Sequence, residues 1–247
     1  MADPTIQHAY TADEPGRSHT AHVVRELGMG IVSGAFAEKT ILPGDAELME
    51  RFGVSRTVLR EAMKTLTGKG LVQDKARIGT RVRPRADWNL FDADVLIWHA
   101  RSGFDAEFLQ YLGEMRLALE PEAAALAAQR RSPAQLQQLY AWVERMGGED
   151  VTPAEFVKAD LNFHLAVAAA ASNPFLRSIS TLIEVALVAM LTISSPIEDP
   201  IEHADSVASH RAIADAIAKR DVDKAREAMR VVIHQGIARR GRRRRGE

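Results

Sequence analysis

Residues 48–66 have the sequence LMERFGVSRTVLREAMKTL, which predicts two short helices around a tight turn. The second helix begins after a serine, and its apolar residues recur at helical spacing along one side. On and beside the other side lie Arg56, Thr57, Arg60 and Lys64. A helix with one buried side and one cationic side is built like a helix that enters the DNA major groove. This stretch therefore predicts a DNA-reading helix-turn-helix.

The composition is that of an ordinary globular protein, with 46 % apolar and 26 % charged residues among 247. No apolar run approaches the roughly 20 residues of a membrane helix. The first residues lack the basic and apolar segments of a secretory signal. The chain has no cysteine, which excludes disulfides and thiolate metal sites and suits a reducing compartment, so we expect a cytoplasmic protein without membrane contact.

The net charge of −1 hides an asymmetry along the chain. Residues 22–85 contain 12 Lys and Arg against 7 Asp and Glu, whereas residues 86–237 contain 13 against 22. A basic N-terminal module joined to an acidic remainder indicates that only the first part binds a polyanion.

The N-terminal third predicts a winged helix-turn-helix after a flexible arm at residues 1–19. Residues 20–85 form the expected DNA-binding domain, in which Ser55 caps the reading helix and Gly79 lies in a basic hairpin. Helices are expected at about 20–33, 46–52 and 56–69, and short strands at 71–73 and 80–83.

The rest of the chain predicts a connector at 86–94, an antiparallel helical bundle at 95–238 and a basic tail at 239–247. Apolar residues recur at three- and four-residue spacing, with almost no strand signal, so the expected fold class is mainly α. The expected helices cover about 104–130, 133–147, 153–172, 175–193, 204–219 and 221–238. The tail is expected to be solvated and disordered, and we assign it no role.

Short motifs connect both parts to a known family. The first set comprises Leu42-Pro43, Glu47-Leu48, Phe52 to Thr57, Arg60-Glu61-Ala62 and Gly70-Leu71-Val72. The second comprises Arg116 with Glu120, Asp160 with His164, Asn173-Pro174, His210, Ala214 to Ile217 and Asp221. Residues 20–83 thus resemble the DNA-binding domain of GntR-type transcriptional regulators, and residues 107–234 resemble the FCD-type helical effector domain of the FadR subfamily. The segment from Asp87 to Trp98 resembles the sugar-acid branch, notably repressors of galactonate catabolism.

The reading helix and hairpin supply the expected contacts to double-stranded operator DNA. Arg56 can donate two parallel hydrogen bonds to guanine, Thr57 can contact a phosphate or a thymine methyl, and Arg60 can reach a base or a phosphate. The full expected set is Ser55, Arg56, Thr57, Arg60, Lys64, Arg77, Gly79 and Thr80. The alternative is that these arginines only solvate a surface helix. A helix-turn-helix reads an inverted repeat as a dimer, so we expect a homodimer.

One position departs from the family pattern in the helix before the turn. Many GntR-type regulators carry an arginine where this chain has Ala46. One base contact is therefore missing, and the operator sequence stays open.

Asp160 and His164 are four residues apart and so share one face of a largely apolar helix. In the resembled family such a pair holds a divalent metal together with a histidine at the position of His210. Two nitrogens and one carboxylate suit zinc, nickel or manganese and leave positions for an effector oxygen. A further family histidine is replaced here by Val232. The alternative is that Asp160 and His164 form a simple pair and that His210 is a core histidine.

Arg116 matches the family arginine that faces the effector pocket and could bind a carboxylate there. The alternative is an ion pair with Glu120, four residues on. With a metal opposite, Arg116 would suit a small hydroxy acid such as an aldonate or a uronate.

The sequence thus predicts a non-enzymatic regulator, a repressor of a sugar-acid or other carboxylate catabolic operon whose DNA binding responds to a small organic acid. One rival is a metal-dependent hydrolase or lyase. Another is a DNA-binding protein with a structural metal and no effector.

Overall fold

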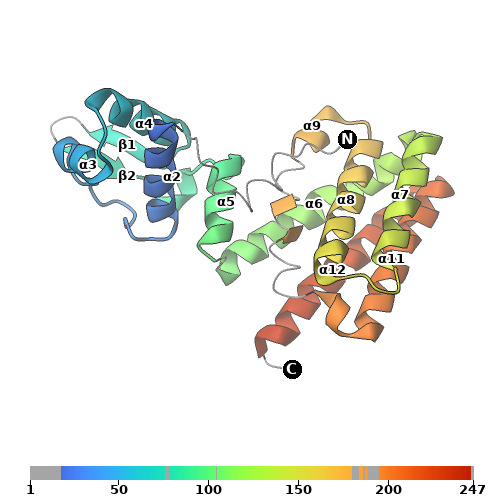
Figure 1. Cartoon of the computed structure of the whole chain (residues 1–247). Helices are drawn as coiled ribbons and strands as arrows, with labels where there is room; N and C mark the ends of the chain where they lie inside the picture. Colours follow the sequence, from blue (N-terminus) through green and yellow to red (C-terminus); the bar gives the residue numbers. More distant parts are fainter. Residues whose placement is uncertain are drawn as a thin grey trace. The chain divides into compact units, whose positions relative to one another are not determined.

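The computed structural model describes residues 18–75, 78–103, 105–179, 184–185, 187–188 and 195–245. Within these residues, no helix is long and apolar enough to span a membrane. The chain divides between residues 104 and 105 into two compact units, both built mainly of helices (Figure 1). The predicted fold class, mainly α with an N-terminal winged helix-turn-helix, is confirmed.

The N-terminal unit combines helices with an antiparallel hairpin, the wing. Its elements are α2 (His19–Val32), α3 (Asp45–Phe52), α4 (Arg56–Gly68), β1 (Val72–Lys75), β2 (Gly79–Val82), the 3-10 turn η1 (Arg85–Asp87) and α5 (Ala93–Arg101). The strands pair in register from Val72 opposite Val82 to Lys75 opposite Gly79. Ile41 bridges to Arg81.

Local sequence signals place the ends of the helix-turn-helix. Ser55 caps α4 by accepting a hydrogen bond from the Val58 amide at 3.4 Å. Gly53 ends α3 with a φ of 61°, a left-handed conformation that costs glycine little. The chain therefore turns sharply between the two helices and presents the N-terminus of α4 on the surface.

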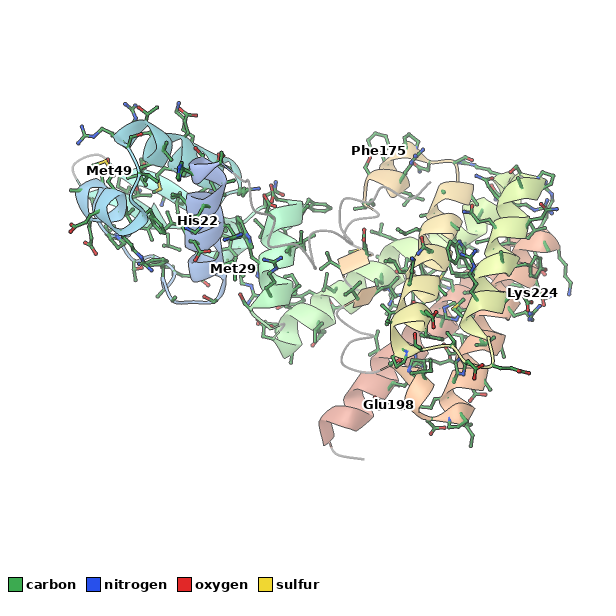
Figure 2. All side chains as sticks on the ribbon, in the orientation of Figure 1. His22, Met29, Met49, Phe175, Glu198 and Lys224 are labelled. Carbon is green, nitrogen blue, oxygen red and sulfur yellow. The ribbon has the colours of Figure 1, made fainter. Side chains whose placement is uncertain are left out.

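A single hydrophobic core holds this unit together. Leu59, Ala62 and Leu66 of α4 are fully buried against the inner side of α2. Met29 of α2 and Met49 of α3 lie at its edge (Figure 2). Since the core side of α4 is apolar and fixed, its polar side is held outward.

The predicted connector at 86–94 packs against the end of α4. Lys69 is 9 % exposed, and its Nζ lies 2.8 and 2.9 Å from the two carboxylate oxygens of Asp92 and 2.7 Å from Asp94. Asp92 also caps α5, through the amides of Asp94 and Val95. A buried ammonium with three carboxylate contacts stabilises this junction.

The predicted start of the helical domain at residue 95 differs from the observed division. α5 contains residue 95 and packs on α2, with the Trp98 ring directly over Gly28. A Cβ on Gly28 would lie 2.3 Å from that ring, so the glycine leaves the space that α5 occupies. The C-terminal unit starts at residue 105 for this reason.

The C-terminal unit is a bundle of antiparallel helices around one large core. Its described elements are α6 (Ala106–Arg130), α7 (Pro133–Met146), α8 (Pro153–Ala170), α9 (Pro174–Ser178), the 3-10 turn η2 (Pro196–Glu198), α11 (Pro200–Ala218) and α12 (Val222–Arg245). α6 packs along α12, where small residues such as Ala124 and Ala128 let the helices approach closely (Figure 1).

Four helices of the bundle begin with the same two-residue signal, a capping side chain followed by proline. Thr152 and Ser132 form capping boxes, while Asn173 and Asp199 accept hydrogen bonds from amides of the first turn. Proline fits the first helical position because its missing N–H would be unpaired there. The predicted breaks at 132–133, 152–153 and 173–174 are confirmed.

Two boundaries of the bundle differ from the prediction. The helix expected from residue 204 begins at Pro200, because Asp199 caps it earlier. The tail expected to be disordered from residue 239 continues α12 to Arg245, because arginine is a good helix former and complements the dipole at a helix C-terminus. The helix expected at 175–193 is described only in part. Its first residues form α9 (Pro174–Ser178), and residues 184–185 and 187–188 are helical. Residues 180–183, 186 and 189–194 lie outside the described residues. Nearly all of the arm expected at 1–19 lies outside them too.

Candidate nucleic-acid interface and metal centre

The polar side of α4 carries exposed cations, as predicted. Arg56 and Arg60 are exposed, and among the described residues neither forms an ion pair. Lys64 is exposed as well, and its Nζ lies 2.7 Å from Glu61 on the same helix. Ser55 and Thr57 are exposed at the start of α4. The guanidinium groups are therefore available to base edges and phosphates.

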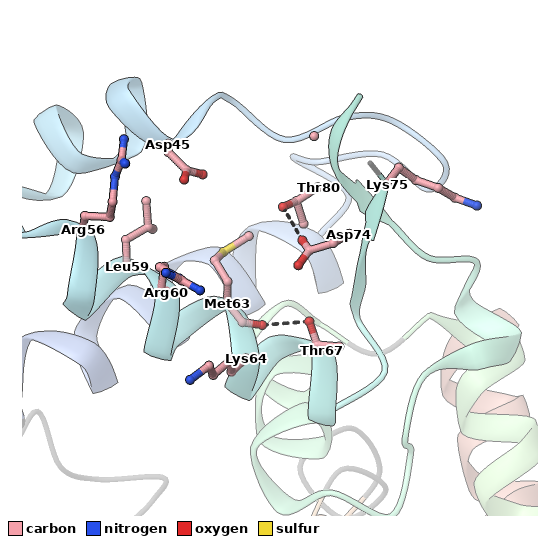
Figure 3. Close-up of a pocket in the computed structure, with 11 residues that line it drawn as sticks. Asp45, Arg56, Leu59, Arg60, Met63, Lys64, Thr67, Asp74, Lys75 and Thr80 are labelled. Atoms are coloured by element: carbon pink, nitrogen blue, oxygen red, sulfur yellow. Dashed lines mark hydrogen bonds between the residues drawn. The ribbon is translucent and has the colours of Figure 1, made fainter. Parts of the chain in front are cut away.

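An open hollow of about 680 Å³ separates this side of α4 from the wing (Figure 3). The cations Arg56, Arg60 and Lys64 line one wall, and Lys75 lines the other. Gly79 and Thr80 of β2 also line it, with Gly79 at a φ of 111°. Of the expected set, Arg56, Arg60, Lys64, Gly79 and Thr80 thus line one concave surface. Ser55 and Thr57 do not line it, and Arg77 lies outside the described residues.

Two carboxylates that the sequence analysis did not select also line this hollow, Asp45 and Asp74. Asp74 lies opposite Thr80 in the wing, and its carboxylate accepts a hydrogen bond from the Thr80 hydroxyl at 2.9 Å (Figure 3). The strand register could have revealed this pair, because residues 74 and 80 are cross-strand neighbours once the hairpin turn is fixed.

In the C-terminal unit, the three predicted metal ligands come together. Asp160 and His164 lie on α8 and His210 lies on α11, and all three are at most 4 % exposed. One ligand atom from each lies within 4.8 Å of the others. His210 Nε2 lies 3.1 Å from Asp160 Oδ1, and His164 Nε2 lies 3.9 Å from Asp160 Oδ2.

The outer nitrogens of both histidines face acceptors. His210 Nδ1 lies 2.7 Å from the Ser206 carbonyl oxygen, which can only accept, so Nδ1 carries a proton and Nε2 is the nitrogen turned toward Asp160. His164 Nδ1 lies 2.5 Å from Glu120 Oε2, a close contact that lacks the alignment of a hydrogen bond. Metal-binding histidines are typically oriented by such acceptors.

The atoms that face one another across this cluster lack well-aligned hydrogen bonds. Within the described residues, Asp160 Oδ2, His164 Nε2 and His210 Nε2 are buried without one, and so is His164 Nδ1 despite its short contact with Glu120. Burying unpaired polar atoms costs free energy, whereas a cation between Asp160 Oδ2 and the two Nε2 atoms would satisfy these three. The donor set therefore fits a divalent metal with three protein ligands.

Arg116 and Glu120 of α6 lie beside this cluster and are almost completely buried. Arg116 Nε lies 2.5 Å from Glu120 Oε1, so the ion pair considered as an alternative is present. Burial by itself would raise the pKa of Glu120, but Arg116 and His164 outweigh it and lower the pKa to about 2. For Asp160, burial is likewise outweighed by His210, His164 and Arg116, and the pKa falls to about 2. Both carboxylates are therefore charged at neutral pH.

Glu120 contacts the cluster although the sequence did not predict this contact. Its spacing to Arg116 indicated only a pair on one helix, whereas its contact with His164 depends on the packing of α6 against α8.

Two other histidines of the C-terminal unit, His203 and His234, do not join this cluster. His203 lies on α11, but its Nε2 bonds the Met146 carbonyl oxygen at 2.7 Å. His234 is exposed on α12. Val232 is buried in the bundle core.

Comparison with known proteins matches residues 19–82 to a model described as bacterial regulatory proteins, gntR family, and residues 111–235 to the FCD domain. The chain belongs to the gntR family of regulators that carry an FCD domain. It is 35 % identical over 213 residues to the uncharacterized HTH-type transcriptional regulator YieP of Escherichia coli K12, covering 85 % of this chain and 90 % of YieP. It is 32 % identical over 214 residues to the galactonate operon transcriptional repressor of the same strain, covering 87 % and 93 %.

A further relative agrees with the family, and one solved structure shares the fold. The chain is 32 % identical over 230 residues to the HTH-type transcriptional repressor NanR of Cronobacter sakazakii, covering 87 % of this chain and 83 % of NanR. A solved structure of Lar, which controls expression of the Listeria monocytogenes agr system, shares the fold with a TM-score of 0.62, at 20 % identity and covering 93 % and 99 %. This gntR-family chain is therefore a DNA-binding transcriptional regulator and not an enzyme, as the sequence predicted.

Proposed function

We propose that this gntR-family regulator represses a carboxylate or sugar-acid catabolic operon and that a small organic acid, bound beside a divalent metal in the FCD domain, releases it from DNA. The observation that carries the proposal is the buried cluster of Arg116, Glu120, Asp160, His164 and His210. The sugar-acid class is supported by the similarity to the galactonate operon repressor.

The charges of this cluster do not balance. Arg116 and Glu120 neutralise each other, and Asp160 adds a negative charge, while a histidine that binds a metal through Nε2 is neutral and adds none. A divalent cation held by Asp160, His164 and His210 would reverse the sign to a net positive charge. A monocarboxylate would then complete neutrality, and buried charges are stable only when they are compensated in this way.

The proposed roles in effector binding follow from the donor atoms. Zinc, nickel or manganese accept two imidazoles and one carboxylate, and a metal with three protein ligands keeps positions for the oxygens of a hydroxy acid. Arg116 supplies positive charge beside the metal, and Glu120 holds both Arg116 and His164 in position.

The proposed DNA-binding residues are Ser55, Arg56, Thr57, Arg60, Lys64, Arg77, Gly79 and Thr80. Arg56 and Arg60 would read base edges in the major groove, while the lysine and wing residues would contact the backbone and the minor groove. Two copies of the chain would read an inverted repeat, so we propose a homodimer.

The test is fluorescence anisotropy of the full chain on the DNA upstream of its own gene, titrated with aldonic and uronic acids in the presence of Zn²⁺. A bound acid is expected to weaken DNA binding by about 5- to 150-fold, which corresponds to the usual allosteric coupling of about 1–3 kcal/mol. Tight DNA binding unaffected by every acid would contradict the proposed effector class.

The metal is tested separately with Zn²⁺ alone. Metal-free protein is expected to gain thermal stability on adding Zn²⁺, by about 2.7 kcal/mol at a concentration 100-fold above Kd. The variant His210→Ala should lose this gain and His234→Ala, which changes an exposed histidine, should keep it. Equal gains in both variants would refute the assigned site. A gain in stability without any response to acids would indicate a structural metal.

A further inference from the structure

The wing places an exposed negative charge inside the cationic hollow. Asp74 and Thr80 lie on the two strands of the wing, across the hollow from α4 (Figure 3). The Thr80 hydroxyl donates its proton to the Asp74 carboxylate at 2.9 Å, so the two side chains can only accept further hydrogen bonds. Among the described residues, no Lys or Arg forms an ion pair with Asp74. The pair therefore presents acceptors and a negative charge to any molecule that enters the hollow.

The other carboxylate of the hollow, Asp45, lies in a different local field. Asp45 is the first residue of α3, where the helix dipole supplies partial positive charge. A strand has only a small net dipole, so Asp74 on β1 lacks this compensation. Asp74 is therefore the carboxylate that acts most strongly on an anion in the hollow.

The effect of this charge depends on what the arginines of α4 bind. On a sequence that offers the right bases, Arg56 and Arg60 donate hydrogen bonds to base edges, which carry no net charge. On any other sequence the same guanidinium groups can pair only with phosphates. Phosphates bound in this way are brought to the hollow that Asp74 also lines, and the carboxylate repels them.

We propose that Asp74 makes DNA binding by this regulator more selective, because its charge penalises complexes that are held by phosphate contacts alone. The inference rests on the proposed contacts of α4 with DNA. Charges act over a Debye length of about 8–10 Å at moderate salt, so the carboxylate needs no direct contact with a phosphate. Asp74 is thus a specificity-determining residue that works by repulsion, in addition to the attractive contacts of the reading helix.

The experiment compares full-length Asp74→Asn with the wild type on an operator and on a scrambled duplex of the same composition. The operator is first selected from random duplexes by the wild type, and affinities are then measured by anisotropy at one salt concentration. The amide oxygen of asparagine can still accept the Thr80 hydrogen bond, so the variant removes the charge and keeps the pair.

Binding of Asp74→Asn to the scrambled duplex should tighten by about 2- to 5-fold, the effect of one interaction between exposed charges. Binding to the operator should change by less, so the ratio of the two affinities falls. The gain on the scrambled duplex should shrink as the salt concentration rises, because screening shortens the range of the repulsion.

Two further variants separate this role from others. Glu38→Gln removes one negative charge from the same unit at an exposed residue that does not line the hollow, and it should keep the wild-type ratio. Asp74→Glu keeps the negative charge and should stay closer to the wild-type ratio than Asp74→Asn does. Equal thermal unfolding of Asp74→Asn and the wild type would show that the fold of the wing is unchanged.

The proposal is overturned if Asp74→Asn keeps the wild-type ratio or tightens binding equally on both duplexes. It is also overturned if Glu38→Gln lowers the ratio as much, because the net charge of the protein would then explain the effect. Arg60→Ala tests the proposed contacts of α4 separately, since it should weaken operator binding whatever Asp74 does. None of these outcomes affects the proposed response to organic acids.

Discussion

The contact between Gly28 and Trp98 allows a test in which two physical effects have opposite signs. In the interior of a helix, replacing glycine with alanine stabilises by about 1 kcal/mol, because alanine loses less backbone entropy. At Gly28, however, the new methyl group would lie 2.3, 2.5 and 2.7 Å from three carbons of the Trp98 ring. Restoring an ordinary 3.4 Å contact requires the ring to retreat by about 1.1 Å.

The cost of that retreat follows from how tightly the ring is held. Trp98 is 4 % exposed in the core of the N-terminal unit, and overpacking such a site costs about 1–3 kcal/mol. Gly68 provides the matched control, because it ends α4, is exposed, and a methyl group added there would meet no atom within 4 Å. Both variants receive a propensity gain, so we expect Gly28→Ala to be less stable than Gly68→Ala by about 1–3 kcal/mol.

The measurement is urea unfolding followed by tryptophan fluorescence. Trp88 and Trp98 report on the N-terminal unit and Trp142 on the C-terminal unit, so the transition of the first unit is expected to shift. Equal stability of the two variants, or a more stable Gly28→Ala, would refute the docking of α5 on α2.

Two further predictions concern the C-terminal unit. Arg131 donates a hydrogen bond to the Ala218 carbonyl oxygen at 2.9 Å at the end of α11, so Arg131→Met should lower the unfolding free energy by about 1–3 kcal/mol. The control Lys224→Met removes an exposed ion pair and should change it by less than about 0.5 kcal/mol. Equal losses of the two variants in thermal unfolding would contradict the stabilising role of the Arg131 contact. The folded pKa values of Glu120 and Asp160 are lowered to about 2 from 4.5 and 3.8, so their contribution is present above the unfolded values and is lost as the pH falls towards 2. The unfolding free energy of Glu120→Gln, measured in urea, should therefore change less than that of the wild type between about pH 6 and pH 3, the range set by those pKa values. Parallel pH curves of the two proteins would count against a charged, stabilising Glu120.

The parts of the fold that the sequence predicted correctly depend on neighbours along the chain. Ser55 and Gly53 mark the ends of the helix-turn-helix, and Thr152 with Pro153 marks the start of α8, because caps and turns are local interactions. The shared face of Asp160 and His164 followed from the helical period alone. His210 lies 46 residues from His164 in sequence, and only the resemblance to a family connected it to the site.

No separate helix was predicted at α5, although Asp92 caps it and its apolar residues recur at the helical period as clearly as those of α2. Residues 95–99 are nevertheless all buried, because the helix packs on more than one side, and only the tertiary structure shows this packing.

By itself, therefore, the sequence determined the fold class, the exposed cationic side of α4 and the shared face of Asp160 and His164 on α8, because helical periods, caps and turns are set within a few residues. The tertiary structure decided the docking of α5, the contact of Glu120 with His164 and the pairing of Asp74 with Thr80 in the wing. These depend on which helix faces and strand positions meet, and such meetings are set by the packing of the whole core.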